Sequence, residues 1–187
     1  MRRLMPVALL LVSVTASAQT FDRFSVQVIG GKSTTNWHGQ ATVQTMNVEM
    51  GRKLWSRTEL GLVFAPMVVR QPRSWFGNTY GDGEENVRAI SGAVFLRQHF
   101  RDDSVRASYY IEAGTGPMWA EKRVPAATSR FNFHSMAGAG VVLYPQARSS
   151  LIIGYRFGHI SNGGYAPRNP GLNVSSLVIG TRIRVGR

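Results

Sequence analysis

The sequence predicts an all-β protein, an eight-stranded antiparallel up-and-down β-barrel that spans a membrane. Eight segments beyond the N-terminal region are rich in Val, Ile, Phe, Tyr and Thr, and Gly or Pro punctuates the gaps between them. Apolar and polar residues alternate within these segments, and the gaps are alternately long and short. No stretch shows a convincing helical period.

The first element is a predicted secretory signal peptide over residues 1–18. Residues 1–3 are Met-Arg-Arg, residues 4–14 form a mostly apolar run, and residues 16–18 are Ala-Ser-Ala. A basic start, a short apolar stretch and a small-residue cleavage site are typical of export signals. The apolar run is too short to span a membrane as a helix. Residues 19–187 then form one barrel domain, which contains no Cys and therefore no disulfide.

The eight predicted strands follow in order. In the fifth, for example, Tyr109, Ile111 and Ala113 alternate with Ser108 and Glu112. Because successive side chains of a strand point to opposite faces, such a strand has one apolar and one polar face. The predicted strands span residues 21–29, 41–51, 59–69, 88–100, 106–119, 130–144, 149–161 and 174–185.

The polar faces combine glycines with opposite charges, including Glu49, Glu59 and Glu112 as well as Arg97 and Arg156. A polar lumen and an apolar outer wall are typical of membrane barrels, and side chains fill the lumen of an eight-stranded barrel. Because buried charges require partners, we expect the three glutamates to pair with luminal arginines. A soluble lipocalin-like barrel, with the two faces reversed, is the alternative architecture.

The gaps indicate the orientation of the barrel. Long outer loops and short periplasmic turns are typical of the bacterial outer membrane. With an even number of strands both termini are periplasmic, so the seventh strand ends at the outer surface. The long gaps cover residues 30–40, 70–87, 120–129 and 162–173, and the short ones cover residues 52–58, 101–105 and 145–148.

The chain carries a formal charge of +12, and 19 of its 22 basic residues are Arg. On an exported protein this favours anionic partners such as phosphorylated lipids, because a guanidinium group binds phosphate bidentately. A cationic surface that only aids solubility is the alternative. Nothing in the sequence indicates binding to nucleic acid.

The end of the seventh strand carries the candidate active site. His159 and Ser161 lie two residues apart, so they share the apolar face that begins at Leu151. A base beside a hydroxyl is the arrangement that activates serine to attack an ester. Its position on an apolar face favours a lipid substrate. An interface histidine and a strand-end serine without catalytic role are the alternative interpretation.

The residues that follow carry a family resemblance. Residues 159–164 have the pattern His-x-Ser-Asn-x-Gly, residues 169–171 are Asn-Pro-Gly, and over about residues 159–176 the chain resembles the lipid A 3-O-deacylases, also called acyloxyacyl hydrolase-like proteins. The resemblance implies an outer-membrane carboxylic ester hydrolase that removes the acyl chain at the 3-position of lipid A. It also implies an active site on the lipid-facing outer wall and no cofactor.

The resemblance implies roles for individual residues. Ser161 would be the nucleophile and His159 its base. Asn169 and the backbone N–H of Gly164, with Asn162 beside them, would bind the oxyanion or the substrate. Preorganised donors of this kind each lower a barrier by about 3–4 kcal/mol.

The sequence departs from the family at Asn173, where the better-known members have a Glu that orients the histidine. No Asp or Glu occurs in residues 122–187, so a carboxylate would have to come from strands distant in sequence. The Asn173 amide oxygen can accept from the imidazole, but it stabilises imidazolium less than a carboxylate, and the acid-to-amide change costs a serine protease about 10⁴ in rate. We therefore expect either a slower hydrolase adapted to Asn173 or a member without activity.

The expected partners are lipid A or lipopolysaccharide and other outer-membrane lipids. A homodimer is a further possibility that the sequence does not decide. No metal site is expected, and a luminal hydrogen bond is expected for His134. A non-catalytic barrel with a structural or lipid-binding role is the alternative function, and a soluble lipid-binding barrel is a third. The arginines expected near lipid A phosphates are Arg70, Arg73, Arg123, Arg130 and Arg168.

Overall fold

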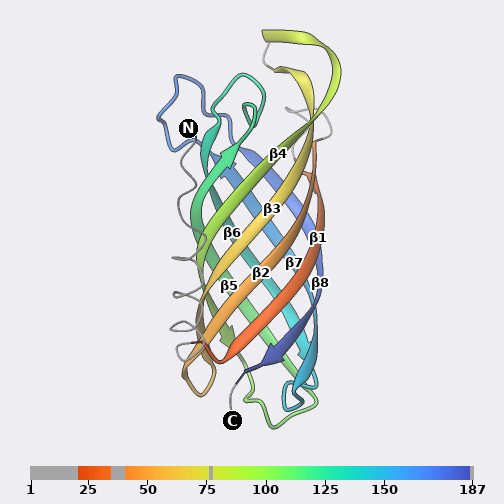
Figure 1. Cartoon of the computed structure of the whole chain (residues 1–187), viewed down its shortest axis with the longest axis vertical. Coiled ribbons are helices and arrows are strands. Elements are labelled where there is room, and N and C mark those ends of the chain that lie inside the picture. Colours follow the sequence, from red (N-terminus) through yellow and green to blue (C-terminus); the bar gives the residue numbers. More distant parts are fainter. Residues whose placement is uncertain (1–20, 35–40, 76–77, 186–187) are drawn as a thin grey trace, which may run out of the picture.

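Eight antiparallel strands close into one barrel, in which consecutive strands pair and β1 also pairs with β8 (Figure 1). The computed structural model describes residues 21–34, 41–75 and 78–185. The predicted fold class is confirmed, whereas the predicted signal peptide lies outside the described residues. The strands are β1 (Arg23–Ser33), β2 (Thr42–Trp55), β3 (Thr58–Trp75), β4 (Asn78–His99), β5 (Ala107–Ala120), β6 (Phe131–Leu143), β7 (Ser149–Ser161) and β8 (Leu172–Arg184).

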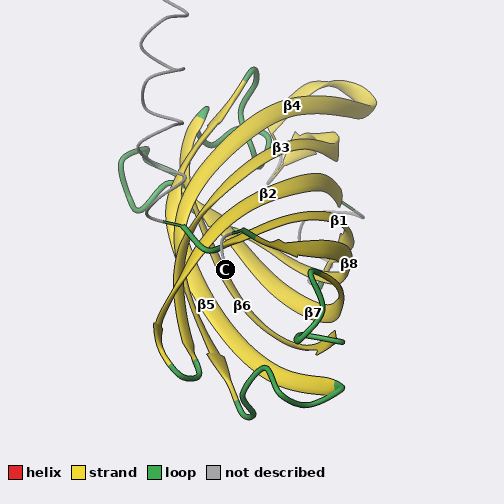
Figure 2. Cartoon of the chain, turned by 60° about the horizontal axis from the view of Figure 1, so that its bottom comes forward, coloured by secondary structure: helices red, strands yellow, loops and turns green. Residues whose placement is uncertain are grey.

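Strands alone form the wall of the barrel, and the loops lie at its two ends (Figure 2). None of the described residues belongs to a helix long and apolar enough to cross a membrane. The predicted seventh strand has the bounds of β7. Most other predicted strands end within a few residues of the observed ones.

The largest difference from prediction lies between β3 and β4. Residues 70–87 were expected to be a long loop, but the two strands continue as a paired hairpin to Trp75 and Asn78, with a shift in register between Pro72 and Ser74. Figure 1 shows this hairpin rising beyond the other strands and bending over. The prediction was wrong because it identified strands by their alternation of apolar and polar residues. That alternation reflects the apolar outer wall of the barrel, and it is lost where the hairpin extends beyond the wall.

The outer wall is apolar and the lumen contains the charged residues. Val28 and Leu177 face outward and are 61% and 74% exposed, whereas Gln27 and Arg97 face inward and are fully buried. A lipocalin-like barrel would have the opposite arrangement. The distribution is that of a membrane barrel.

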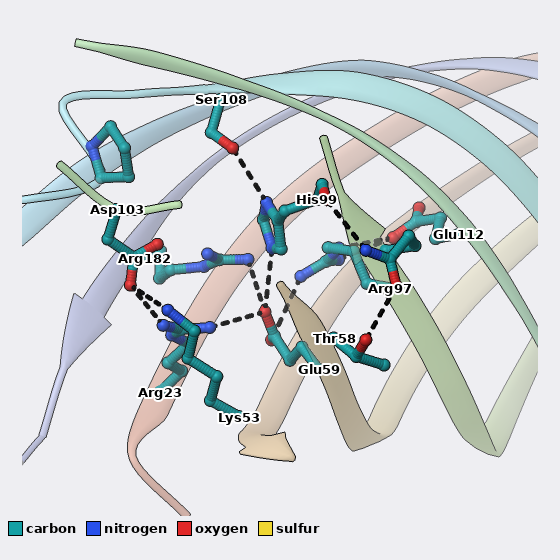
Figure 3. Close-up of polar contacts among 12 residues, drawn as sticks. Arg23, Lys53, Thr58, Glu59, Arg97, His99, Asp103, Ser108, Glu112 and Arg182 are labelled. Atoms are coloured by element: carbon teal, nitrogen blue, oxygen red, sulfur yellow. Dashed lines mark hydrogen bonds and ion pairs between the residues drawn. The ribbon is translucent and has the colours of Figure 1, made fainter. Parts of the chain in front are cut away.

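The lumen holds a network of ion pairs centred on Arg97. Its guanidinium group lies 2.9 Å from Glu49, 3.3 Å from Glu59 and 2.7 Å from Glu112, and Figure 3 shows it between Glu59 and Glu112. Arg156 contacts Glu112 at 2.6 Å and Glu49 at 3.2 Å. The predicted pairing of the three glutamates with luminal arginines is confirmed.

The turn between β4 and β5 closes the lumen at the end where β1 begins and β8 ends. Asp103 accepts hydrogen bonds from Arg23 on β1 at 2.6 Å, Lys53 on β2 at 3.1 Å and Arg184 on β8 at 3.2 Å. Figure 3 shows Asp103 facing Arg23 and Lys53. One carboxylate therefore ties a turn to three strands on the opposite side of the barrel.

Apolar side chains fill the lumen between the ion pairs and the opposite end of the barrel, where β7 ends. Val43, Met67, Phe95 and Ile160 belong to this cluster of buried residues. His134 lies on the luminal face, as expected, where it lines a small cavity with Ile160 and Arg156. The inward face of β7 is thereby packed, which holds its outward face in place.

We predict that Arg97→Met lowers the free energy of unfolding by about 3–5 kcal/mol, because it leaves three buried carboxylates without their shared cation. The measurement is a urea titration of the folded barrel in lipid vesicles. Arg88→Met is the control, since Arg88 is exposed on the same strand. Equal stability of the two variants would contradict the assigned role of the network.

Candidate active site

His159 and Ser161 lie on the outer wall of the barrel. Along β7, Tyr155 and Phe157 are exposed, while Arg156 and Ile160 are buried in the lumen. The two candidate residues continue the outward set and are half-buried. The imidazole and the hydroxyl therefore face the surroundings of the barrel, as the alternation predicted.

The register of the sheet places a polar residue on each side of His159. On β6 the opposite residue is Ser135, and on β8 it is Asn173. His159 Nδ1 lies 2.6 Å from Asn173 Oδ1, so Nδ1 carries the proton and donates to the amide oxygen. This tautomer leaves Nε2 with a free lone pair, as a general base requires.

The loop after Ser161 is organised by Asn162. The Asn162 side chain is fully buried, its amide group donates to the Arg168 carbonyl at 2.7 Å, and its oxygen accepts from the Gly164 N–H at 2.9 Å. Such a contact from Asn to the backbone two residues later stabilises a turn. Asn162 was expected beside the oxyanion or substrate, but its polar groups are used within the loop.

Asn169 is held over the end of β7. Its side-chain oxygen accepts from the Asn162 N–H at 3.0 Å, and the residue is exposed. With the oxygen engaged by the backbone, the amide nitrogen is the end available to donate. The Gly164 N–H, the other expected oxyanion donor, donates instead to Asn162 in this structure.

Gly171 packs against the imidazole, a contact that sequence reasoning missed. Its φ is 67°, and a Cβ at this position would lie 2.6 Å from His159 Cε1. Any other residue would strain the backbone and collide with the ring. The Asn-Pro-Gly pattern was the available signal, but the contact depends on how the loop folds back onto β7.

Aromatic side chains brace the loop on its other side. Phe133, opposite Ser161 in the β6–β7 register, stacks on Tyr165 with ring centroids 6.1 Å apart. Phe131 contacts both rings, at 5.6 Å and 6.3 Å. A Cβ on Gly163 would lie 3.2 Å from the Phe133 ring. The loop that carries Gly163 and Gly164 is thus packed on aromatic rings of the outer wall.

The part of the chain that the structure describes contains no group of three or more His, Cys, Asp or Glu residues that could hold a metal ion. The arginines expected near phosphates lie at the outer end of the barrel or in its loops and are exposed. Arg130 lies over the Trp119 ring at 5.2 Å, and Arg70 pairs with Glu84.

Two solved structures with this fold match most of the chain. The outer-membrane enzyme PagL matches with a TM-score of 0.61 and 19% identity, over 86% of this chain and 99% of that one. Neisserial surface protein A matches with a TM-score of 0.57 and 15% identity, over 87% and 96%. These matches show the fold of the chain, a closed antiparallel β-barrel.

The sequence comparisons identify the family. Residues 19–182 match the lipid A 3-O-deacylase (PagL) family. The lipid A deacylase PagL of Bordetella bronchiseptica is 39% identical over 75 residues, which cover 37% of this chain and 38% of that protein. The chain belongs to the lipid A 3-O-deacylase family.

We predict that Gly171→Ala displaces the His159 ring, because the added Cβ collides with it and the backbone conformation costs about 1–2 kcal/mol for a residue other than glycine. The nitrogen-15 resonances of the imidazole, which report its tautomer and hydrogen bond, will shift in histidine-labelled protein. Gly92→Ala is the matched control, since a Cβ at Gly92 meets nothing within 4 Å. Unshifted His159 resonances in the Gly171 variant would refute the packing role.

Proposed function

We propose that this chain is a lipid A deacylase of the outer membrane, which hydrolyses the ester of the 3-O-linked acyl chain by a Ser/His mechanism. The observation that carries the proposal is the 2.6 Å contact between His159 and Asn173. His159 lies two residues before Ser161, whose side chain also faces outward. The chain that carries these residues belongs to the lipid A 3-O-deacylase family. We infer from this arrangement that Asn173 orients the imidazole, that His159 is the base and that Ser161, on the same face of β7, is the nucleophile.

In the proposed reaction His159 Nε2 takes the proton of Ser161 Oγ while the oxygen attacks the ester carbonyl. The tetrahedral intermediate collapses as imidazolium returns the proton to O3 of the sugar, which leaves as a hydroxyl. The acyl group remains on Ser161 as an ester. Water, deprotonated by the same imidazole, then releases the fatty acid and restores the serine.

Asn173 would act in this reaction by fixing the imidazole rather than by charge. Its oxygen holds the proton on Nδ1, which keeps Nε2 ready to accept the serine proton. A neutral amide stabilises the imidazolium of the transition state less than a carboxylate does. The proposed enzyme is therefore slower than a relative with a glutamate at this position.

The oxyanion would be held chiefly by the Asn169 amide nitrogen. The backbone N–H of Asn162 holds the side-chain oxygen of Asn169. The amide nitrogen of Asn169 is thereby preorganised to donate to the negative charge that develops on the carbonyl oxygen of the ester. The Gly164 N–H adds a second donor only when its hydrogen bond to Asn162 opens.

The outer wall offers the substrate a direct route from the bilayer. Exposed apolar residues such as Tyr155, Phe157 and Leu177 surround the site, so the acyl chains of lipid A would remain in an apolar environment while the ester meets Ser161. The membrane concentrates the substrate, and the reaction requires no cofactor.

We predict that Ser161→Ala reduces release of 3-hydroxy fatty acid by at least about 10³-fold, the scale of loss for a catalytic serine. Mass spectrometry of lipid A from cells that express each variant is the measurement, with heat-modifiable migration on gels as the check of folding. The matched control is Ser135→Ala, because Ser135 is opposite His159 on β6. Release that persists without Ser161 would exclude it as the nucleophile.

A second prediction concerns the orienting residue. Asn173→Asp should raise kcat, because a carboxylate stabilises the imidazolium that forms. Asn173→Leu should lower kcat by about 10- to 100-fold, the range found when the partner that orients a metal-bound histidine is removed. Rates are measured on purified barrels in mixed micelles with lipid A. A lower rate for the Asp variant would contradict the proposed role of the amide.

The amide at position 173 also favours the second candidate function, a non-catalytic barrel with a structural or lipid-binding role. Loss of the usual carboxylate is the expected change in a member that has lost activity. Lipid A mass spectra that are identical with and without the wild-type chain would support this candidate.

A further inference from the structure

A hollow adjoins the candidate active site on the outer wall. It has a volume of about 680 Å³ and lies over β7, β8, β1, β2 and β3. Its floor includes Gly30, which faces outward and has no side chain to fill the space. Lys32 and Arg70 line it, as do Tyr155 and Ser175.

The register of the strands connects the hollow to the catalytic residues. Ser175 lies two residues after Asn173 on the outward face of β8, and its partner on β1 is Lys32. Lys32 pairs in turn with Thr42 on β2, and Thr42 with Arg70 on β3. One row of outward polar residues therefore runs from the flank of the active site across four strands.

This row contrasts with the wall around it, where Val26, Val28, Leu62 and Phe64 are exposed apolar residues. A charged group on the lipid-facing wall is costly unless it is paired or reaches the polar headgroups. Tyr155 and Ser175 satisfy each other, with their oxygens 2.7 Å apart. Two of the described residues that line the hollow are cations. Arg70 is paired with Glu84, whereas Lys32 forms no ion pair with a described residue.

We propose that this hollow binds a phosphate monoester of the substrate lipid, with the Lys32 ammonium as its cation. This inference rests on the proposed function, since it assumes that the ester of the same lipid lies at Ser161. The Lys32 ammonium, which lies beside Thr42 and Ser175 in this row, fits an anionic headgroup.

The first test changes the charge. Lys32→Gln should raise KM for diphosphorylated lipid A about tenfold, the loss expected for one charge-assisted contact. The value of kcat should stay within about twofold of the wild type, because the contact stabilises the ground state and the transition state equally. Lys32→Arg should retain most of the affinity. Lys122→Gln is the matched control, because Lys122 is exposed in the β5–β6 loop and lies outside the hollow.

The substrate is then varied to test the phosphate itself. With lipid A from which both phosphates have been removed, the wild type should show the raised KM and Lys32→Gln no further increase. Inorganic phosphate at millimolar concentration should not compete if the site recognises a lipid headgroup. Strong competition would mean that the hollow binds free phosphate rather than the headgroup.

The second test fills the hollow without a change of charge. Gly30→Leu should fit the backbone, because a Cβ there meets nothing within 4 Å, and should raise KM for diphosphorylated lipid A while the barrel stays folded. Gly92→Leu is the matched control, another outward glycine with nothing within 4 Å of its Cβ.

Binding is also measured without turnover, so that failure of this inference can be distinguished from failure of the proposed function. Ser161→Ala protein in nanodiscs should bind diphosphorylated lipid A more tightly than dephosphorylated lipid A, and Lys32→Gln should abolish the difference. Unchanged KM and binding in both the Lys32 and Gly30 variants would overturn the inference. Absence of turnover in the wild type, with this difference in binding intact, would overturn only the proposed function.

Discussion

The ion pairs around Arg97 are the constraint on which the rest of the structure depends. An eight-stranded barrel has no room for a water-filled lumen, so a polar inner face must satisfy its own charges. Arg97 and Arg156 do this with glutamates from β2, β3 and β5. Each contact fixes two strands relative to each other, and charge that is neutralised inside the barrel leaves the outer wall free to be apolar.

The candidate site follows from that fixed register. Arg156 is anchored in the lumen three residues before His159, so the alternation of β7 turns the imidazole outward. The pairing of β7 with β8 then brings Asn173 directly opposite His159. Gly171 completes the site because its missing side chain allows the loop to close on the ring. Luminal packing and outer-wall chemistry are thus two sides of the same strands.

The proposed reaction with a lipid also explains why polar side chains lie on the outer wall around the candidate site. The wall is largely apolar, and polar side chains lie beside the proposed ester and along the row that contains Lys32 and Ser175. Polar groups in such a wall are stabilised by one another, as Tyr155 and Ser175 are, or by the substrate. A lipid substrate could therefore be aligned by its headgroup while its ester meets the nucleophile.

The sequence by itself determined the strand count, the bounds of β7, the outward direction of His159 and Ser161, and the need for Glu49, Glu59 and Glu112 to find arginines. These properties depend on a local period of two residues and on the cost of burying charge. Only the tertiary structure decided which arginine meets which glutamate, that the β3–β4 hairpin continues beyond the wall, that Asn162 takes the Gly164 N–H, and that Gly171 lies against the imidazole. Those contacts depend on the closure and register of the barrel and on loop conformation. They join residues far apart in the chain and produce no periodic pattern in the sequence.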